Sequence, residues 1–232
     1  MMTINVRVTP YERDNLKALA TVTLGSGIKL HGIRVMENKD GRMFASYPAY
    51  KTKTGEFEQY FHPITKEFNE KLNNAILTAY DSENHRFSTQ SETVIDPAVS
   101  VRAAEFRQAN MRGLASVILD DSFVINSVRI MRGEHGLFTS MPSYRDKNGE
   151  YQDYVELKGD IRGVIRDKSV EALTNAKVNQ ADKTASKSVS GQTEKEKNTV
   201  SSNVGDKMKA EGKKQGQQAR QVQKQSGMMA VR

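Results

Sequence analysis

Apolar and polar residues alternate at the start of the chain in a way that predicts short β-strands. Residues 4–8 alternate, Pro10 is expected to end this strand, and a polar connection leads to a second alternating stretch at 18–24. Gly25-Ser26-Gly27 can adopt positive φ, so a hairpin and a third strand at 28–35 should follow. We therefore expect an antiparallel sheet at the beginning of the chain.

The third strand changes phase halfway. Ile28 and Leu30 share one face, but Ile33 and Val35 continue the apolar pattern one residue out of step. Since side chains alternate strictly between the two faces of a strand, one extra residue near His31-Gly32 would restore the apolar face. The sequence therefore predicts a β-bulge at this point.

The same pattern returns about 95 residues later. Alternating stretches at 99–103 and 115–119 match the first two strands, and Asp120-Asp121-Ser122 stands where the glycine turn was. The next strand again slips by one residue, at Asn126-Ser127. A phase break at equivalent points of two copies indicates that the bulge is a feature of the fold.

Two stretches that follow these strands, 43–57 and 137–151, carry the clearest repeat. They are identical at 7 of 15 paired positions. In both, an apolar strand end runs into a proline, and a polar loop with a central base then closes with Gly-Glu-aromatic. A period this long is typical of a duplicated small domain rather than a solenoid.

Each copy should end in a helix. Thr65 is a suitable N-cap, and the apolar residues from Phe68 to Ala79 fall at helical spacing. In the second copy a helix is expected to start at Ile161. The predicted fold class is α+β, with two modules that each have a small antiparallel sheet followed by a helix and that pair as an intramolecular pseudo-dimer. The boundaries are module 1 at 1–80, a linker at 81–97, module 2 at 98–174, and a disordered Lys/Gln/Ser-rich tail at 175–232.

The charge of the chain is concentrated in that tail. The formal net charge is +7, and the tail holds 12 Lys/Arg against 5 Asp/Glu, whereas the other 23 bases and 23 acids cancel. A basic tail favours a polyanionic partner, although such tails also serve as solvated extensions. The start of the chain lacks the apolar core of a signal peptide, and no apolar run reaches membrane-spanning length, so we expect a cytoplasmic protein that contacts no membrane.

The order of motifs resembles the SpoVG family of septation regulators, present here as a tandem pair. The resemblance rests on Ile-Arg-Val or Val-Arg-Ile at the strand end, Gly-x-Phe, the proline, the basic loop and Gly-Glu-aromatic, and it covers roughly 2–80 and 98–160. It implies small α+β modules that pair through their sheets, here within one chain and also as a homodimer in the family. It further implies a regulator of septation or sporulation that binds DNA and RNA.

Candidate binding residues lie on and beside the basic loops. A base next to an aromatic ring suits nucleic acid, because the base neutralises phosphate and the ring stacks on an unpaired nucleobase. The alternatives are a solvated loop with a tyrosine at the sheet edge and, for the two strand arginines, a cross-strand partner such as Glu37. The candidates are Tyr50, Lys51, Lys53, Tyr144, Arg145, Lys147, Arg34 and Arg129.

No pattern in the sequence indicates catalysis. The four histidines lack metal-ligand spacing, and we find no carboxylate pair, nucleophile with a base, or phosphate-binding glycine loop. We therefore expect no catalytic residues, no metal and no cofactor. The competing hypothesis to a nucleic-acid-binding regulator is a protein-interaction adaptor whose tail is a tether.

Overall fold

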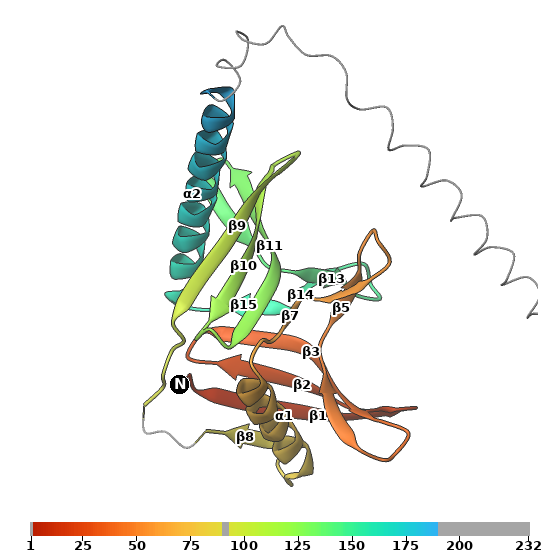
Figure 1. Cartoon of the computed structure of the whole chain (residues 1–232). Helices are drawn as coiled ribbons and strands as arrows, with labels where there is room; N and C mark the ends of the chain where they lie inside the picture. Colours follow the sequence, from red (N-terminus) through yellow and green to blue (C-terminus); the bar gives the residue numbers. More distant parts are fainter. Residues whose placement is uncertain (1, 90–92, 190–232) are drawn as a thin grey trace, which may run out of the picture. The chain divides into compact units, whose positions relative to one another are not determined.

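Two antiparallel sheets, one for each copy of the repeat, form the framework of the protein (Figure 1). The computed structural model describes residues 2–89 and 93–189. The part of the predicted 175–232 tail that begins at residue 190 therefore lies outside the described residues. The fold is α+β, as the sequence predicts, and both modules belong to one compact unit that ends at Ala185.

The first sheet has six strands in the order β15-β3-β2-β1-β8, with β4 also paired to β3. Its strands from module 1 and the linker are β1 (Ile4–Arg13), β2 (Leu16–Leu24), β3 (Ile28–Glu37), β4 (Met43–Ser46) and β8 (Arg86–Ser88). The second sheet has the order β12-β11-β10-β9, with β7 also paired to β11. Its strands from module 2 are β9 (Val99–Gln108), β10 (Met111–Leu119), β11 (Phe123–Gly133) and β12 (Gly136–Ser140).

The two modules exchange their last strands. Strand β7 (Phe61–Pro63) belongs to module 1 in sequence but pairs with β11 of module 2. Strand β15 (Val155–Leu157) belongs to module 2 but pairs with β3 of module 1. The hydrogen bonds beyond these strands are also reciprocal, since Ile64 donates to the Ser122 carbonyl and Lys158 donates to the Gly27 carbonyl, each at 2.8 Å. Neither sheet is therefore complete without the other half of the chain.

Both predicted bulges are present. In β3 two residues lie opposite Thr21, because Ala20 pairs with Ile33 and Val22 pairs with Leu30. In β11 Asn126 and Ser127 lie opposite Ser116 in the same way. One residue in each bulge adopts positive φ, Gly32 at 78° and Ser127 at 58°. The apolar side chains of each strand return to the core face as the phase break required.

We expected strand β1 to stop at Pro10, but it continues to Arg13. Val8 donates its N–H to the carbonyl of His85, on the side where β8 lies. The backbone nitrogen of Pro10, two residues further, faces the same side of β1, and β8 pairs with β1 only as far as Arg7. Proline is tolerated there because no neighbouring strand requires its missing N–H.

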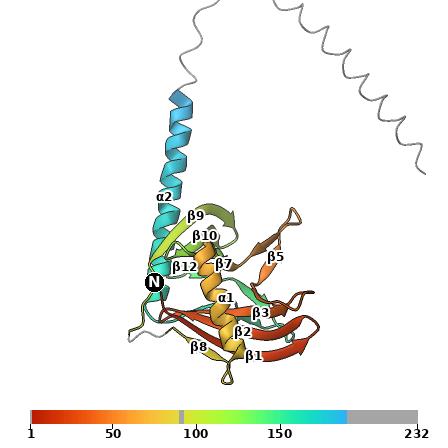
Figure 2. The same cartoon turned by 60° about the horizontal axis from the view of Figure 1, so that its bottom comes forward.

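Each sheet is covered by a helix (Figure 2). Helix α1 (Lys66–Asp81) starts at the predicted cap, where the Thr65 hydroxyl accepts from the Phe68 N–H at 3.3 Å, and it buries Phe68, Leu72, Ala75, Ile76 and Ala79. Helix α2 (Ile161–Val189) buries Ile165 and Leu173 in module 2. It continues past residue 174, so residues 175–189, which we assigned to the tail, are helical. Likewise, the predicted linker contains β8.

The buried apolar residues of both modules form one cluster. Within it, Phe123 of β11 packs against Phe61 of β7 and Phe68 of α1, with ring centroids 6.1 and 6.0 Å apart. Because residues from both halves share this core, the modules stabilise each other through apolar burial as well as through strand pairing.

Candidate functional site

Two small hairpins, one from each module, lie next to each other on the protein (Figure 1). The first is formed by β5 (Ala49–Lys51) and β6 (Phe57–Gln59), and the second by β13 (Ser143–Arg145) and β14 (Tyr151–Asp153). They are the two repeated stretches with the basic loops. The structure thus brings together the two sequence segments that carry most of the candidate residues.

A row of four stacked tyrosines joins the hairpins. The ring centroids of Tyr50 and Tyr60 are 4.8 Å apart, those of Tyr60 and Tyr154 are 4.9 Å apart, and those of Tyr154 and Tyr144 are 4.7 Å apart. These distances are within the range of favourable offset packing between aromatic rings. We refer to Tyr50, Tyr60, Tyr154 and Tyr144 as the tyrosine ladder.

The bulges position the two central tyrosines of the ladder. Asn126 donates its backbone N–H to the Tyr60 carbonyl at 2.7 Å, and His31 donates to the Tyr154 carbonyl at 2.8 Å. Each tyrosine is therefore attached to the bulge of the opposite module. A β-carbon on Gly32 would lie only 3.0 Å from Cε1 of Tyr154, so the glycine leaves room for that ring.

Two hydroxyls of the ladder, those of Tyr50 and Tyr154, have raised pKa values. The hydrogen bond that Tyr50 donates to Glu58 raises the pKa of Tyr50, and the hydrogen bond from Ser127 opposes this shift. Burial raises the pKa of Tyr154, the nearby Tyr60 and Tyr144 add to the effect, and the charge of Arg34 opposes it. Tyr50 and Tyr154 therefore remain neutral at physiological pH.

The predicted loop bases lie at the ends of the hairpins, and all four are exposed. The guanidinium of Arg145 lies 4.8 Å from the centroid of the Tyr151 ring, which is a cation–π contact. Lys51 is the register partner of Phe57 in the equivalent place. Each hairpin thus pairs a base with an aromatic ring, but the ring is not the one that we expected, since Tyr50 and Tyr144 already stack on the ladder.

The two strand arginines differ from each other. Arg34 is exposed, and Glu37, the acid we considered as its partner, instead bonds Lys17 at 2.8 Å. Arg129 is half-buried and donates to the Ser140 hydroxyl at 3.1 Å. Within the described residues, Arg34 therefore makes no ion pair, and Arg129 contacts a serine across the strands, not the acid that we gave as the alternative.

Sequence reasoning missed Phe57 and Tyr151 as candidate site residues. In the described part of the chain they are the most exposed of the large apolar side chains, at 75% and 68%. The signal was present in the repeat, because both copies end in Gly-Glu-aromatic, but the ring alone does not show whether it faces the core. The structure shows that both rings point to solvent.

The hairpins are not basic overall. Residues 49–59 contain two bases and two acids, and residues 143–153 contain two bases and three acids. Two of these acidic side chains have hydrogen-bond partners within their hairpins. Glu58 accepts from Tyr50, and Asp146 accepts two backbone N–H groups of its own loop, each at 2.9 Å. Any attraction for phosphate at the hairpins is therefore local to the loop ends.

A groove of about 970 Å³ lies between the first hairpin and the second sheet. Two polar atoms at its edge, the Tyr47 hydroxyl and His62 Nδ1, are buried without a hydrogen-bond partner among the described residues. Burial raises the pKa of Tyr47 and lowers the pKa of His62, so both side chains are neutral at physiological pH. Their burial makes them part of the packing between the modules.

Two further findings concern metals and membranes. Within residues 2–89 and 93–189, no group of three His, Asp or Glu side chains is placed to hold a metal ion. None of the helices in the described part of the chain is long and apolar enough to cross a membrane.

Fold and site together define a duplicated α+β protein whose modules exchange strands and present paired hairpins. The family model for SpoVG matches residues 1–82 and 97–175, which are the two modules, and the chain belongs to the SpoVG family. The tandem duplication predicted from the sequence is thus confirmed.

Three relatives, each named "Putative septation protein SpoVG", illustrate the similarity. The protein from Treponema denticola is 41% identical over 75 residues, which cover 32% of this chain and 77% of the relative. That from Clostridium botulinum (strain Alaska E43) is 37% identical over 81 residues, covering 34% and 88%. That from Clostridium acetobutylicum is 33% identical over 94 residues, covering 40% and 98%. Each relative therefore matches about one module's length of this chain.

Proposed function

We propose that the protein is a non-enzymatic, cytoplasmic regulator that binds nucleic acid through the paired hairpins and acts in septation. The observation that carries the proposal is the placement of two base-and-aromatic pairs, Lys51 with Phe57 and Arg145 with Tyr151, on adjacent hairpins. The relatives are named as septation proteins, which supports the cellular role.

The chemistry of the hairpins favours single strands or unpaired bases. An exposed ring offers a stacking face to any nucleobase, and such stacking contributes about 1–3 kcal/mol per base. The neighbouring Lys51 or Arg145 side chain adds an attraction to phosphate, which weakens as the salt concentration rises. Because the tyrosine ladder fixes the hairpins relative to each other, little conformational freedom is lost when both bind the same strand.

A salt titration with two double variants tests the proposal. Replacing Lys51 and Arg145 with Ala should lower the slope of log affinity against log salt by about 1.4 on single strands and about 1.8 on duplex, at roughly 0.7–0.9 per phosphate contact. Replacing Phe57 and Tyr151 with Ala should weaken single-strand binding by about 1–3 kcal/mol for each base that stacks, with little change in slope.

The matched control is Lys66→Ala with Lys168→Ala, which removes the same charge from exposed positions on the two helices. A loop variant that shows the same slope as this control would reject Lys51 and Arg145 as phosphate contacts. The titration is carried out with the full chain and with residues 1–189, so that the contribution of the remaining segment is measured separately.

A protein-interaction adaptor is the second candidate, and the charge balance of the hairpins favours it. Exposed rings on a surface without net positive charge are also typical of protein contact sites. If the 1–189 protein fails to bind any oligonucleotide, the hairpins are not a nucleic-acid surface and the adaptor becomes the better interpretation.

A further inference from the structure

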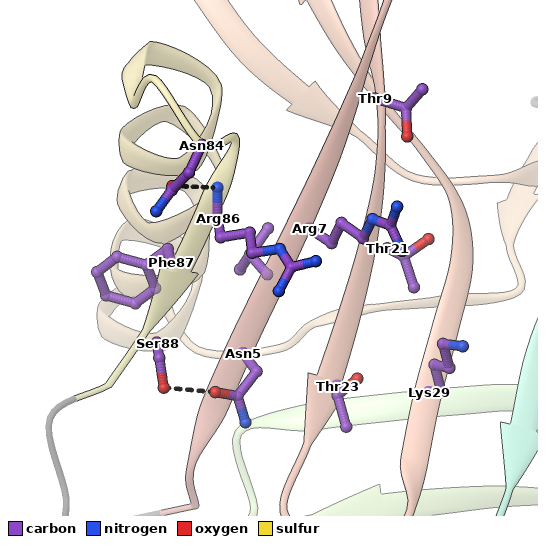
Figure 3. A pocket seen from close by; sticks show the side chains of 11 residues that line it. Asn5, Arg7, Thr9, Thr21, Thr23, Lys29, Asn84, Arg86, Phe87 and Ser88 are labelled. Carbon is purple, nitrogen blue, oxygen red and sulfur yellow. Dashed lines mark hydrogen bonds between the residues drawn. The ribbon is translucent and has the colours of Figure 1, made fainter.

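The solvent-facing side of the first sheet, opposite α1, holds a basic groove of about 720 Å³ (Figure 3). Strands β8, β1, β2 and β3 form its floor. Three of the 11 residues that line it are bases, Arg7, Lys29 and Arg86, and none is an acid. This groove is separate from the hairpins, which have no net positive charge.

Two of the bases are direct neighbours. Arg7 on β1 is the register partner of Arg86 on β8, and like charges opposite each other on adjacent strands are destabilising. Among the described residues, neither guanidinium makes an ion pair. Lys29 has an acidic neighbour, Glu156, which lies 3.7 Å away and is shared with Lys158 and His31. An anion bound between the two arginines would relieve their repulsion.

Neutral hydrogen-bond donors surround the arginines. Figure 3 shows Arg7 reaching over β2 toward Thr21, with Asn5 and Thr23 in the next row of side chains. The Ser88 hydroxyl bonds the carbonyl oxygen of the Asn5 side chain, which leaves the Asn5 amide N–H groups free to donate. Guanidinium groups with hydroxyl and amide donors are suited to phosphate oxygens.

Among the described residues, the part of the groove that holds Lys29 and Arg86 has no counterpart in module 2, although Arg102 stands there in the place of Arg7. The row that contains Thr23 and Lys29 in the first sheet contains Ile118 and Val124 in the second, and these two side chains are 8% and 7% exposed. Strand β8, which supplies Arg86, lies in the linker between the two segments that match the family. The groove therefore arises from the way in which this chain joins its modules.

The basic face continues to the hairpins. Arg34 lies on the same side of the sheet, in the row next to that of Arg7 and Thr21, and its charge acts on Tyr154 of the tyrosine ladder. Adjacent rows on one face of a strand are about 6.6–6.8 Å apart. Arg34 is thus placed between the groove and the hairpins.

We propose that this groove binds the phosphate backbone of the nucleic acid whose bases stack on the hairpins, with Arg7 and Arg86 as the principal contacts and Arg34 as the connection. The inference rests on the proposed function and names the surface that supplies its phosphate affinity. An open groove along the strands suits a chain of phosphodiesters, and a basic groove beside the hairpins explains how hairpins without net positive charge would bind a polyanion.

The test uses the full chain carrying Arg7→Gln with Arg86→Gln. The control carries Arg107→Gln with Arg166→Gln, which removes the same charge from arginines already paired with Glu105 and Asp167 at 2.7 and 2.8 Å. Affinity for a single-stranded and a duplex oligonucleotide is measured over a range of salt. The groove variant should lose about 1.4 units of slope on single strands and about 1.8 on duplex, and the control should keep the wild-type slope.

Thermal unfolding with and without pyrophosphate provides a second measurement. Without the anion, the groove variant should unfold at the same or a higher temperature than the wild type, because a repulsive pair has been removed. Pyrophosphate should raise the midpoint of the wild type and of the control but not that of the groove variant. Equal stabilisation of all three proteins would contradict the anion site.

The outcomes separate the two proposals. If the wild type binds oligonucleotide and the groove variant keeps the slope of the control, the groove does not contact phosphates and the hairpin proposal stands. If the groove variant loses slope while Lys51→Ala with Arg145→Ala does not, the groove is supported as the phosphate-binding surface. The hairpins then lose their role as phosphate contacts. If the wild type binds no oligonucleotide, both proposals fail.

Discussion

At the scale of single residues, the bulge positions connect backbone conformation to the candidate site. Gly32 and Ser127 adopt positive φ, and the exchanged tyrosines Tyr154 and Tyr60 are attached beside them. An L-residue rarely adopts this conformation, and serine at position 127 shows that a side chain is accepted in module 2. Gly32 differs because the Tyr154 ring lies directly above it.

Gly32→Ala should destabilise the protein more than Gly41→Ala. Both glycines have almost the same φ, 78° and 75°, so the cost of placing alanine in the left-handed region, about 1–2 kcal/mol, is common to both. At Gly41 the nearest atom to a new β-carbon is 3.8 Å away, whereas at Gly32 the Tyr154 ring is at 3.0 Å. Overpacking should add about 1–3 kcal/mol at Gly32, measured as the difference in free energy of unfolding in urea. Equal losses for the two variants would show that the ring moves aside without cost.

At the scale of elements, the exchanged strands β7 and β15 have the largest effect on the architecture. Each has only three residues, yet each completes a sheet of the other module and places a buried side chain in the shared core, Phe61 in β7 and Val155 in β15. A short strand gains little from hydrogen bonds alone, so its position depends on that burial.

Phe61→Ala should therefore lower the free energy of unfolding by about 3–5 kcal/mol, as expected for removing a fully buried ring. Phe57→Ala, four residues earlier, removes the same atoms from a side chain that is 75% exposed and should change stability by no more than about 0.5 kcal/mol. Chemical denaturation of the two variants measures the contrast. Comparable losses would mean that the Phe57 ring has a structural role that its exposure conceals.

At the scale of the whole molecule, the described residues as far as Ala185 form a single compact unit that contains two family modules. Each sheet includes a strand from the other half, and one apolar cluster spans both. The covalent connection raises the effective concentration of each module for the other, so the pairing does not depend on protein concentration. This arrangement also keeps the two hairpins at a constant relative position through the tyrosine ladder.

Cutting the chain between Thr89 and Thr93 should leave the halves associated. A protease site introduced there breaks the covalent link while β7 and β15 remain in the opposite sheets. After cleavage, gel filtration should show one species at the position of the uncut protein, which separates into two fragments only in denaturant. Two separate folded fragments under native conditions would contradict the interdependence of the modules.

Several features could be predicted from sequence because their causes lie within a few residues. Alternation predicts the strands, the double phase break predicts the bulges, and Thr65 with the spacing of Phe68 and Leu72 predicts α1. Pro10 shows the limit of this reasoning, since whether a proline ends a strand depends on whether a neighbouring strand needs its N–H. The continuation of α2 beyond residue 174 was missed because we took the polar composition there as a sign of disorder. Polar residues indicate exposure to solvent, and an exposed segment can still be helical.

The candidate site was predicted in part. The loop bases are exposed as expected, but Phe57 and Tyr151 had to be recognised from their exposure, and Tyr50 and Tyr144 proved to belong to the ladder. The basic groove was not visible in the sequence at all, since Arg7 and Arg86 are 79 positions apart and meet only because β8 pairs with β1.

By itself, the sequence determined that this protein is a tandem pair of α+β modules with bulged strands, a capped first helix and repeated basic loops, because each of these follows from local periodicity and residue type. The tertiary structure alone decided which sheet each short strand joins, which aromatic rings stack and which face solvent, and where uncompensated positive charge collects. These depend on contacts between residues far apart in the chain, and the local pattern of a strand is the same whichever partner it pairs with.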